Sequence, residues 1–245
     1  MNLRPKVNYQ QLEADNNYYF FNPKSAPDFQ PDYFSSNYWQ QRNAIIGSAQ
    51  GRGTTWFISY EEQSWVLKHY YRGGLVGKVL KDGYLYTGLN QARSVAEFTL
   101  LNKLTTLNLP VPKPIACSVI RKGFYYQADL ITSKIENAKD LVGILENQSI
   151  DKRLWREVGK TIQQFHHHGV YHHDLNIHNI LIDSEEKVWI IDFDRGEIRK
   201  PAQQWQQANM ARLKRSFLKE QKRLNNFNWQ QSEFESLLLG YQLTR

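Results

Sequence analysis

The sequence predicts an α+β protein with two lobes. Its first half contains aromatic and β-branched stretches separated by Gly-rich or polar turns, a pattern typical of antiparallel strands. Its second half contains longer segments with apolar residues at one-turn spacing, which is typical of helices. Between the halves, at "SKIENAKDL", the composition turns polar. We therefore expect an N-terminal antiparallel sheet lobe with one main helix in residues 1–135 and a mostly helical C-terminal lobe in residues 136–245.

The N-terminal lobe is expected to carry an irregular cap. Residues 17–43 are rich in aromatic residues and asparagine, and three prolines interrupt them: Pro23, Pro27 and Pro31. After a Gly-rich turn, "TTWFISY" and "SWVLK" stand on either side of a short polar segment, so they predict a β-hairpin. A further strand is predicted at "FYYQADLIT".

One long helix is predicted in each lobe. "LNQARSVAEFTLLNKLTTLN" contains no Gly or Pro and has regularly spaced apolar residues, and "LPVPKP" ends it because the residue before a proline avoids helical geometry. "IDKRLWREVGKTIQQFHHHG" predicts the second helix, with Asp151 as its N-cap and Gly169 just beyond its C-terminus. "NILID" and "VWIID" then predict a hairpin, and the basic C-terminal third is predicted to be helical.

Composition limits the function classes. The 245 residues are 41% hydrophobic, which is enough for a folded core, and 31 Lys and Arg against 24 Asp and Glu favour anionic partners. The single cysteine, Cys117, fits a reducing cytosol and is expected to be a small core residue. No apolar run resembles a signal peptide or a membrane-spanning helix, so we expect the protein on the cytoplasmic side.

Three polar residues in residues 170–196 indicate a phosphate-and-magnesium site. Asp174 precedes Asn179 by five residues in "HHDLNIHN", a spacing that lets a loop put the carboxylate on an acceptor hydroxyl and the amide oxygen on a metal. Asp192 follows the apolar strand "VWII", where its carboxylate emerges at the strand end and suits a hard cation. The alternative is a polar turn and hairpin in which these residues only cap the backbone.

The spacing resembles the catalytic and metal-binding loops of the protein-kinase-like superfamily. The upstream features of that family are present too: a Gly-rich loop "GSAQGRGTT", a strand lysine in "WVLK" and a helix glutamate in "SVAEF". By this resemblance Lys68 holds the nucleotide phosphates, Glu97 orients Lys68, and backbone amides near Gly51 and Gly53 lie over the phosphates. Asn179 and Asp192 then bind Mg²⁺, and Asp174 orients or deprotonates the acceptor hydroxyl.

Two residues and one missing segment depart from that pattern. His173 stands where many protein kinases have arginine, and Asp194 replaces the glycine of the metal-binding loop. No A-P-E-like segment follows Asp192. We therefore expect a compact kinase for small molecules or lipid-linked sugars, without a peptide-docking lobe. For Asp194, binding at the metal or sugar and simple capping of its own turn stay open.

A more specific resemblance covers roughly residues 45–220. "GSAQGRGTTWF", "LKHYYRGGLVGK", "LPVPKPIA", "YQADLIT" with "KIENA", "HHDLNIHNILI", "DFDRG" and "RLKRSF" together resemble the Kdo kinase family of bacterial lipopolysaccharide assembly, relatives of the core heptose kinases. The resemblance implies ATP-dependent phosphorylation of the 4-hydroxyl of a 3-deoxy-D-manno-octulosonic acid (Kdo) residue on a lipid A precursor. It also implies a peripheral position on the cytoplasmic face of the inner membrane.

Several alternatives remain at the level of sequence. The chain could be a heptose kinase, a small protein kinase or a non-catalytic pseudokinase module. Arg72 and Lys78 are candidates for contact with an anionic acceptor. The alternative is that they belong to a flexible loop whose charges are only solvated. The basic segment "ARLKRSFLKEQKRL" is a candidate for contact with anionic lipid, against a solvated helix face. We expect neither nucleic acid nor an obligate protein partner, and no zinc at the histidine run 166–168.

Overall fold

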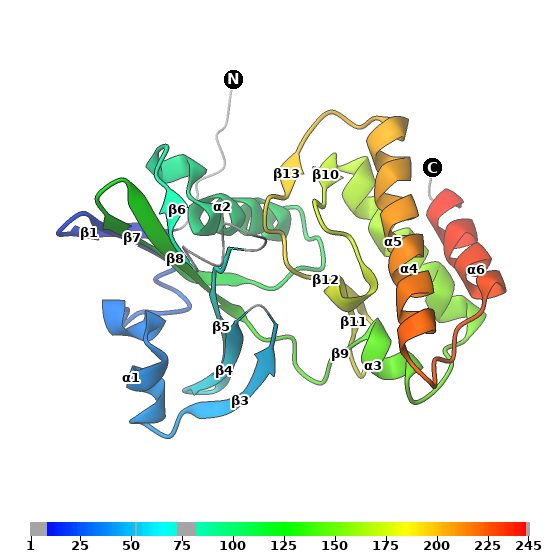
Figure 1. Ribbon diagram of the computed structural model, residues 1–245, viewed down its shortest axis with the longest axis horizontal. Helices are drawn as coiled ribbons and strands as arrows, with labels where there is room; N and C mark the ends of the chain where they lie inside the picture. Colours follow the sequence, from blue (N-terminus) through cyan, green and yellow to red (C-terminus); the bar gives the residue numbers. More distant parts are fainter. Residues whose placement is uncertain (1–8, 52, 73–81, 244–245) are drawn as a thin grey trace. The chain divides into compact units, whose positions relative to one another are not determined.

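The computed structural model describes residues 9–51, 53–72 and 82–243 (Figure 1). The chain forms two compact units, which are treated separately below. The first contains residues Met1–Asn102 and Lys113–Lys134, and the second contains Lys103–Pro112 and Ile135–Arg245. The short segment Lys103–Pro112 thus groups with the C-terminal residues, whereas a single boundary after residue 135 would put it in the N-terminal lobe. One bond that holds it there is donated by the Ile190 amide to the Pro110 carbonyl, at 3.0 Å.

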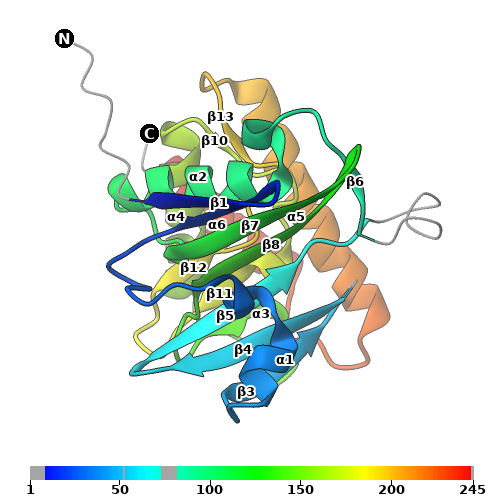
Figure 2. The ribbon, with the colours of Figure 1, turned by 90° about the vertical axis from the view of Figure 1, so that its left-hand side faces the viewer.

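An eight-stranded sheet forms most of the first unit, and all its pairings are antiparallel (Figure 2). The strand order is β1-β2-β7-β8-β5-β4-β3, and β6 pairs with β8. The strands are β1 (Gln10–Ala14), β2 (Asn17–Phe21), β3 (Ile45–Gln50), β4 (Thr54–Tyr60), β5 (Gln63–His69), β6 (Tyr84–Leu85), β7 (Pro114–Lys122) and β8 (Tyr125–Ser133). The predicted hairpin is confirmed as β4 and β5, and the predicted strand before the polar boundary is β8.

The expectation of an irregular cap over residues 17–43 is wrong for much of that segment. Asp15 and Asn16 both have positive φ, the geometry of a tight two-residue turn, so β1 and β2 form a hairpin whose second strand pairs with β7. Further on, a 3₁₀ helix η1 (Pro31–Phe34) and the helix α1 (Ser36–Gln40) follow. The three prolines are compatible with these elements. Pro23 and Pro27 lie outside β2, and Pro31 is at the first position of η1, where a proline is tolerated.

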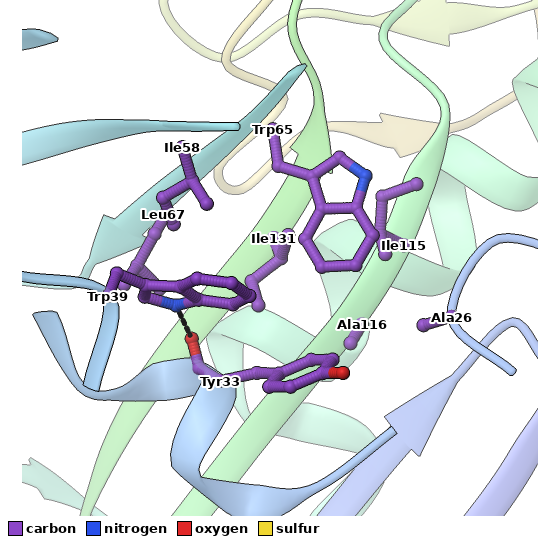
Figure 3. Packing of buried hydrophobic residues seen from close by; sticks show 9 residues of the cluster. All are labelled: Ala26, Tyr33, Trp39, Ile58, Trp65, Leu67, Ile115, Ala116 and Ile131. Atoms are coloured by element: carbon purple, nitrogen blue, oxygen red, sulfur yellow. Dashed lines mark hydrogen bonds between the residues drawn. The ribbon is translucent and has the colours of Figure 1, made fainter. Parts of the chain in front are cut away.

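The aromatic residues of this segment fill a core on the sheet (Figure 3). Tyr33, Trp39 and Trp65 pack with aliphatic side chains from β4, β5, β7 and β8, and all three are buried. The indole of Trp39 donates a hydrogen bond to the carbonyl oxygen of Tyr33 at 2.8 Å, which satisfies its polar group inside the core. The aromatic richness of the N-terminal region is therefore a packing feature of the first unit.

The main helix of the first unit is α2 (Arg93–Thr106), which lies within the predicted range and whose last residues, from Lys103 on, group with the second unit. It is attached to the sheet by polar contacts as well as by its apolar face. The hydroxyl of Ser94 donates to the Ser118 carbonyl on β7 at 2.7 Å, and the amide of Arg93 donates to the Tyr126 hydroxyl on β8 at 3.1 Å. Strand β7 itself was not predicted, although it holds Cys117, a fully buried residue of the core.

The second unit consists mainly of helices (Figure 1). These are α3 (Leu141–Leu145), α4 (Lys152–His167), α5 (Gln203–Arg223) and α6 (Gln231–Gln242). A small antiparallel sheet joins β9 (Lys139–Asp140), β11 (Ile180–Ile182) and β12 (Val188–Ile190), and β10 (Val170–Tyr171) pairs with β13 (Glu197–Ile198). The predicted α+β class, a sheet with one main helix followed by a mostly helical part, is confirmed.

Helix α4 begins and ends as the sequence predicts. The Asp151 carboxylate accepts a hydrogen bond from the Leu154 amide at 2.7 Å, and Gly169 takes a φ of +73° just after the helix. Helix α6 lies beside α4 at very close range (Figure 1). A Cβ placed on Gly159 would lie 1.9 Å from the Leu237 carbonyl oxygen, and one on Gly240 would lie 2.0 Å from that of Arg156. Two glycines therefore permit this packing.

Within the described residues, no helix combines the length and the apolar character needed to cross a bilayer.

Candidate active site

In the first unit, β5 and α2 bring Lys68 and Glu97 together. The ammonium of Lys68 lies 3.2 Å from the Glu97 carboxylate, whose side chain is only 3% exposed, against 27% for that of Lys68. The same carboxylate oxygen accepts a hydrogen bond from the Tyr70 hydroxyl at 2.5 Å. A buried carboxylate needs such partners because removal from water penalises its charge. The pair thus holds the lysine ammonium at a defined and partly accessible position.

In the Gly-rich turn between β3 and β4, packing against a neighbouring ring explains why position 53 is a glycine. A Cβ on Gly53 would lie 1.8 Å from the Tyr71 ring, so only glycine fits without displacing that ring. The amide of Gly51 donates to the Gly53 carbonyl at 3.0 Å, which closes the turn. Contact of this turn with phosphates stays a prediction. Arg72, the other candidate anion contact, donates to the Gly83 carbonyl at 3.2 Å, and Lys78 lies outside the described residues.

In the second unit, His172 links the loop of Asp174 to the end of β12. Its Nδ1 accepts a hydrogen bond from the Asp174 amide at 3.2 Å, so Nε2 carries the proton of the neutral ring. Nε2 then donates to the Ile191 carbonyl oxygen at 2.9 Å. The ring is buried and packs against Phe193, with 4.8 Å between ring centroids. His172 therefore braces the loop between Asp174 and the end of β12.

Asn179 and Asp192 flank the hairpin of β11 and β12. Asn179 precedes β11 and Asp192 follows β12, and the Ile191 amide donates to the Asn179 carbonyl at 3.0 Å, so the hairpin brings both to one end. The Asn179 side-chain nitrogen donates to the Asp174 carbonyl at 3.0 Å, which leaves its amide oxygen as the atom able to bind a cation. Asp192 is exposed and has a φ of +61°. This pair of oxygen ligands fits Mg²⁺, which takes one or two protein oxygens beside phosphates and water.

Arg212 of α5 pairs with the Asp174 carboxylate. Its Nη1 lies 2.7 Å from Oδ1 of Asp174, and the two side chains are 46% and 53% exposed. The sequence did not indicate this contact, because 38 residues separate the partners. The candidate acceptor-binding carboxylate therefore has a cation beside it, and both remain open to solvent.

The same helix contacts the loop at three further positions. Asn209 donates to the His172 carbonyl at 3.0 Å, and the Ser216 hydroxyl accepts from the Ile177 amide at 3.0 Å. Glu220 lies 3.4 Å from Nε2 of His178, whose Nδ1 lies 3.2 Å from Asp140. The hydrogen bond to Asp140 and the one to Glu220 raise the pKa of His178 above its usual value against the effect of burial. One face of α5 thus follows the loop from His172 to His178.

Comparison with known proteins assigns the family. The family model described as "Lipopolysaccharide kinase (Kdo/WaaP) family" matches residues 36–241. The chain belongs to this lipopolysaccharide kinase family. A relative from Photobacterium damsela subsp. piscicida, named 3-deoxy-D-manno-octulosonic acid kinase, is 47% identical over 90% of this chain and 94% of its own length. A relative of the same name from Mannheimia succiniciproducens is 45% identical over 95% of this chain and 99% of its own length.

A solved structure, that of the Cydia pomonella granulovirus kinase PK-1, is similar at a TM-score of 0.44 and 13% identity. It covers 69% of this chain and 58% of its own.

In this lipopolysaccharide kinase, both departures from the protein-kinase pattern are half-buried. His173 lies against Tyr171, with 6.3 Å between ring centroids. Asp194 follows Phe193, which is fully buried and stacks on Phe165 at 5.7 Å. The buried Phe193 anchors the turn that exposes Asp192.

Sequence reasoning missed the contribution of α5 to this site. It placed Arg212 in a basic segment that either contacts anionic lipid or is a solvated helix face, and it did not single out Asn209 or Ser216. Their spacing of three to four residues shows that they share a helix face, but it contains no information about what that face contacts. The histidine run also receives a local explanation. His166 is buried between helices, with Nδ1 2.7 Å from the Tyr241 hydroxyl.

Proposed function

We propose that this chain is a Kdo kinase that transfers the γ-phosphate of ATP to the 4-hydroxyl of a Kdo residue on a lipid A precursor. The observation that carries the proposal is similarity to proteins named 3-deoxy-D-manno-octulosonic acid kinase at 45–47% identity over 90–95% of the chain. The charged side chains on the described elements supply the groups that phosphoryl transfer needs.

Asp174 acts on the acceptor in this proposal. Its carboxylate accepts a hydrogen bond from the sugar hydroxyl and takes the proton as the hydroxyl oxygen bonds to the γ-phosphorus. The bond from that phosphorus to the β–γ bridging oxygen breaks, and ADP leaves with the bonding electrons. The Asp174 side chain is 53% exposed, which leaves it accessible to an acceptor. His172 fixes its backbone, since the Asp174 amide donates to the His172 ring.

Lys68, Asn179 and Asp192 act on the nucleotide side. Lys68, held by Glu97 at 3.2 Å, donates to phosphate oxygens, and the amides near Gly51 and Gly53 lie over the phosphates. Asn179 and Asp192 hold Mg²⁺ through oxygen atoms. When bound, this ion would neutralise the negative charge that develops on the phosphate oxygens during transfer.

The deciding experiment measures phosphate transfer directly. Purified protein, ATP and Mg²⁺ are incubated with lipid A precursor bearing one Kdo, and separately with heptose-containing core, and products are analysed by mass spectrometry. We expect a mass gain of one phosphate on the Kdo acceptor. Transfer only to heptose would replace Kdo kinase by heptose kinase, and failure to bind Mg²⁺-ATP would replace it by a pseudokinase module.

Asp174→Ala tests the mechanism in the same assay. We expect kcat to fall by about 10²- to 10⁴-fold, the contribution of a general base, with little change in nucleotide affinity. Arg156→Ala, which removes an exposed charge from α4, is the control and should retain activity. Equal turnover by the Asp174→Ala variant would remove Asp174 from the mechanism.

We further propose a peripheral position on the cytoplasmic face of the inner membrane. The support is the exposed basic face of α5, which carries Arg215, Lys219, Lys222 and Arg223 beside the partly exposed Leu218. Each suitably placed cation contributes about 1 kcal/mol of attraction to an anionic leaflet. Co-sedimentation with phosphatidylglycerol vesicles should fall for the double variant Lys219→Glu/Lys222→Glu. It should persist for the control double variant Lys113→Glu/Lys122→Glu, which makes the same change of charge outside α5. Equal binding by both pairs would exclude α5 as the contact.

A further inference from the structure

The ion pair of Arg212 and Asp174 is not needed to hold the loop in place. Asn209 and Ser216 of the same helix already bind the loop backbone on either side of Asp174, at 3.0 Å each. An ion pair between half-exposed side chains contributes little to folding stability, because water screens the attraction in the folded protein and ordering two side chains costs entropy. The position of Arg212 therefore calls for an explanation in terms of ligand binding.

Most N–H groups of the Arg212 guanidinium remain available to a ligand at this position. Its guanidinium carries five N–H groups in a planar fork, and within the described residues only one of them, on Nη1, meets a protein acceptor. That bond occupies Oδ1 of Asp174, so Oδ2 is the oxygen left for an acceptor hydroxyl. A sugar bound through that hydroxyl lies next to the remaining N–H groups of Arg212.

The chemistry of the acceptor matches this arrangement. Kdo is a sugar acid, so it has a carboxylate in addition to its hydroxyls, whereas a neutral heptose has none on its ring. A guanidinium fork binds a carboxylate through two parallel hydrogen bonds, a geometry that an ammonium or an amide cannot reproduce. Arg212 contacts Asp174, the residue proposed for the acceptor, whereas the nucleotide phosphates are assigned to Lys68 and to the ligands of Mg²⁺. The acceptor carboxylate is therefore favoured over a phosphate.

We propose that Arg212 binds the carboxylate of the sugar acid while Asp174 holds its hydroxyl. Arg212 is then the residue that selects an acidic over a neutral acceptor sugar. This inference rests on the proposed Kdo kinase activity and names the residue by which it recognises its substrate.

The test compares two acceptors that differ only in the proposed recognition group. One is lipid A precursor with one Kdo, and the other is the same compound with the Kdo carboxylate reduced to a primary alcohol. The wild-type protein, Arg212→Gln, Arg212→Lys and the control Arg156→Gln are assayed on both in detergent micelles, with kcat and KM determined for acceptor and for ATP. Circular dichroism verifies that each variant is folded.

We expect the wild-type protein and the Arg156→Gln control to prefer the acid by about 10- to 100-fold in kcat/KM, the range for a hydrogen bond to a charged group. Arg212→Gln should use the two acceptors almost equally, with an unchanged KM for ATP. Arg212→Lys should show an intermediate preference, because an ammonium lacks the fork.

The outcomes separate this inference from the proposed function. A variant Arg212→Gln that loses activity equally on both acceptors, or that keeps the preference for the acid, would overturn the inference and assign Arg212 to the positioning of Asp174. A raised KM for ATP in that variant would overturn it in favour of phosphate binding. A wild-type protein that phosphorylates neither Kdo compound would overturn the proposed function and this inference with it.

Discussion

The His172 side chain donates a hydrogen bond from Nε2 to the carbonyl oxygen of Ile191 at 2.9 Å. Because Nδ1 of the same ring accepts from the Asp174 amide, one buried imidazole connects the loop of Asp174 with the residue before Asp192. The two halves of the second unit's site are thus joined by a side chain that makes no contact with a reacting group in the proposed mechanism. Its loss should disturb their relative positions.

His172→Ala should lower kcat by about 10²-fold, the effect of a shift of roughly 1 Å in reacting groups. It should also destabilise the protein, since each buried polar group left without a partner costs about 1–3 kcal/mol. Steady-state kinetics and urea unfolding measure the two effects. His167→Ala, a change of an exposed histidine at the end of α4, is the control and should change neither. A stable His172→Ala variant with normal kcat would show that the brace is dispensable.

Lys68→Met should impair the use of ATP. The methionine keeps the apolar stem but removes the ammonium that lies 3.2 Å from Glu97. We expect kcat/KM for ATP to fall by about 10²- to 10³-fold, as for other donors that stabilise developing charge.

The melting temperature of Lys68→Met should fall as well, because the buried Glu97 carboxylate then loses the ammonium that lies 3.2 Å from it. Lys122→Met, a change of an exposed lysine on β7, serves as the control in both assays. Normal ATP kinetics together with a lower melting temperature would make the Lys68–Glu97 pair purely structural.

Stability should decrease in acid through His166. Burial lowers the pKa of this side chain to about 4, although the hydrogen bond with Asn209 opposes the shift. The unfolded chain takes up a proton near pH 6.5 and the folded protein does not, so the stabilisation is complete above pH 6.5 and is lost as the pH falls towards 4. By pH 5 the loss should be about 2 kcal/mol.

Urea unfolding at pH 7.5 and pH 5 measures this loss. His166→Gln removes the titrating group, so its stability should change less between the two pH values than that of the wild-type protein. His168→Gln, an exposed neighbour, should behave like the wild type. The same pH dependence in His166→Gln and in the wild type would assign the acid sensitivity to other groups.

Gly159→Ala should destabilise the second unit. The added Cβ would lie 1.9 Å from the Leu237 carbonyl oxygen, so α6 must move away from α4. Insertion of one methyl group into such a contact costs about 1–3 kcal/mol, which outweighs the better helix propensity of alanine. Thermal unfolding measures the change, and Gln164→Ala on the exposed face of α4 is the control. An unchanged or higher melting temperature would mean that the helices adjust without cost.

Local sequence determined much of this protein. Apolar periodicity, the N-cap Asp151 and the αL residue Gly169 act within one turn of chain, so the helix α4 and the α+β class were predictable. The order Lys68, Glu97, Asp174, Asn179 and Asp192, with its spacing, indicated the candidate site and the resemblance to a kinase family. The tight turn at Asp15 and Asn16 is also local, but the three prolines that follow it favour an irregular segment in the sequence.

Only the tertiary structure decided which residues surround Asp174. The pairing with Arg212, 38 residues further along the chain, depends on the packing of α5 against the loop. A helical repeat defines a face but not its partner, and a charge on that face suits solvent, lipid or a carboxylate equally well. For the same reason, the requirement for glycine at position 159 is not visible in the sequence, because it arises only from the packing of α6 against α4. Contacts between distant segments follow from the fold as a whole, whereas propensities and spacings act within a few residues.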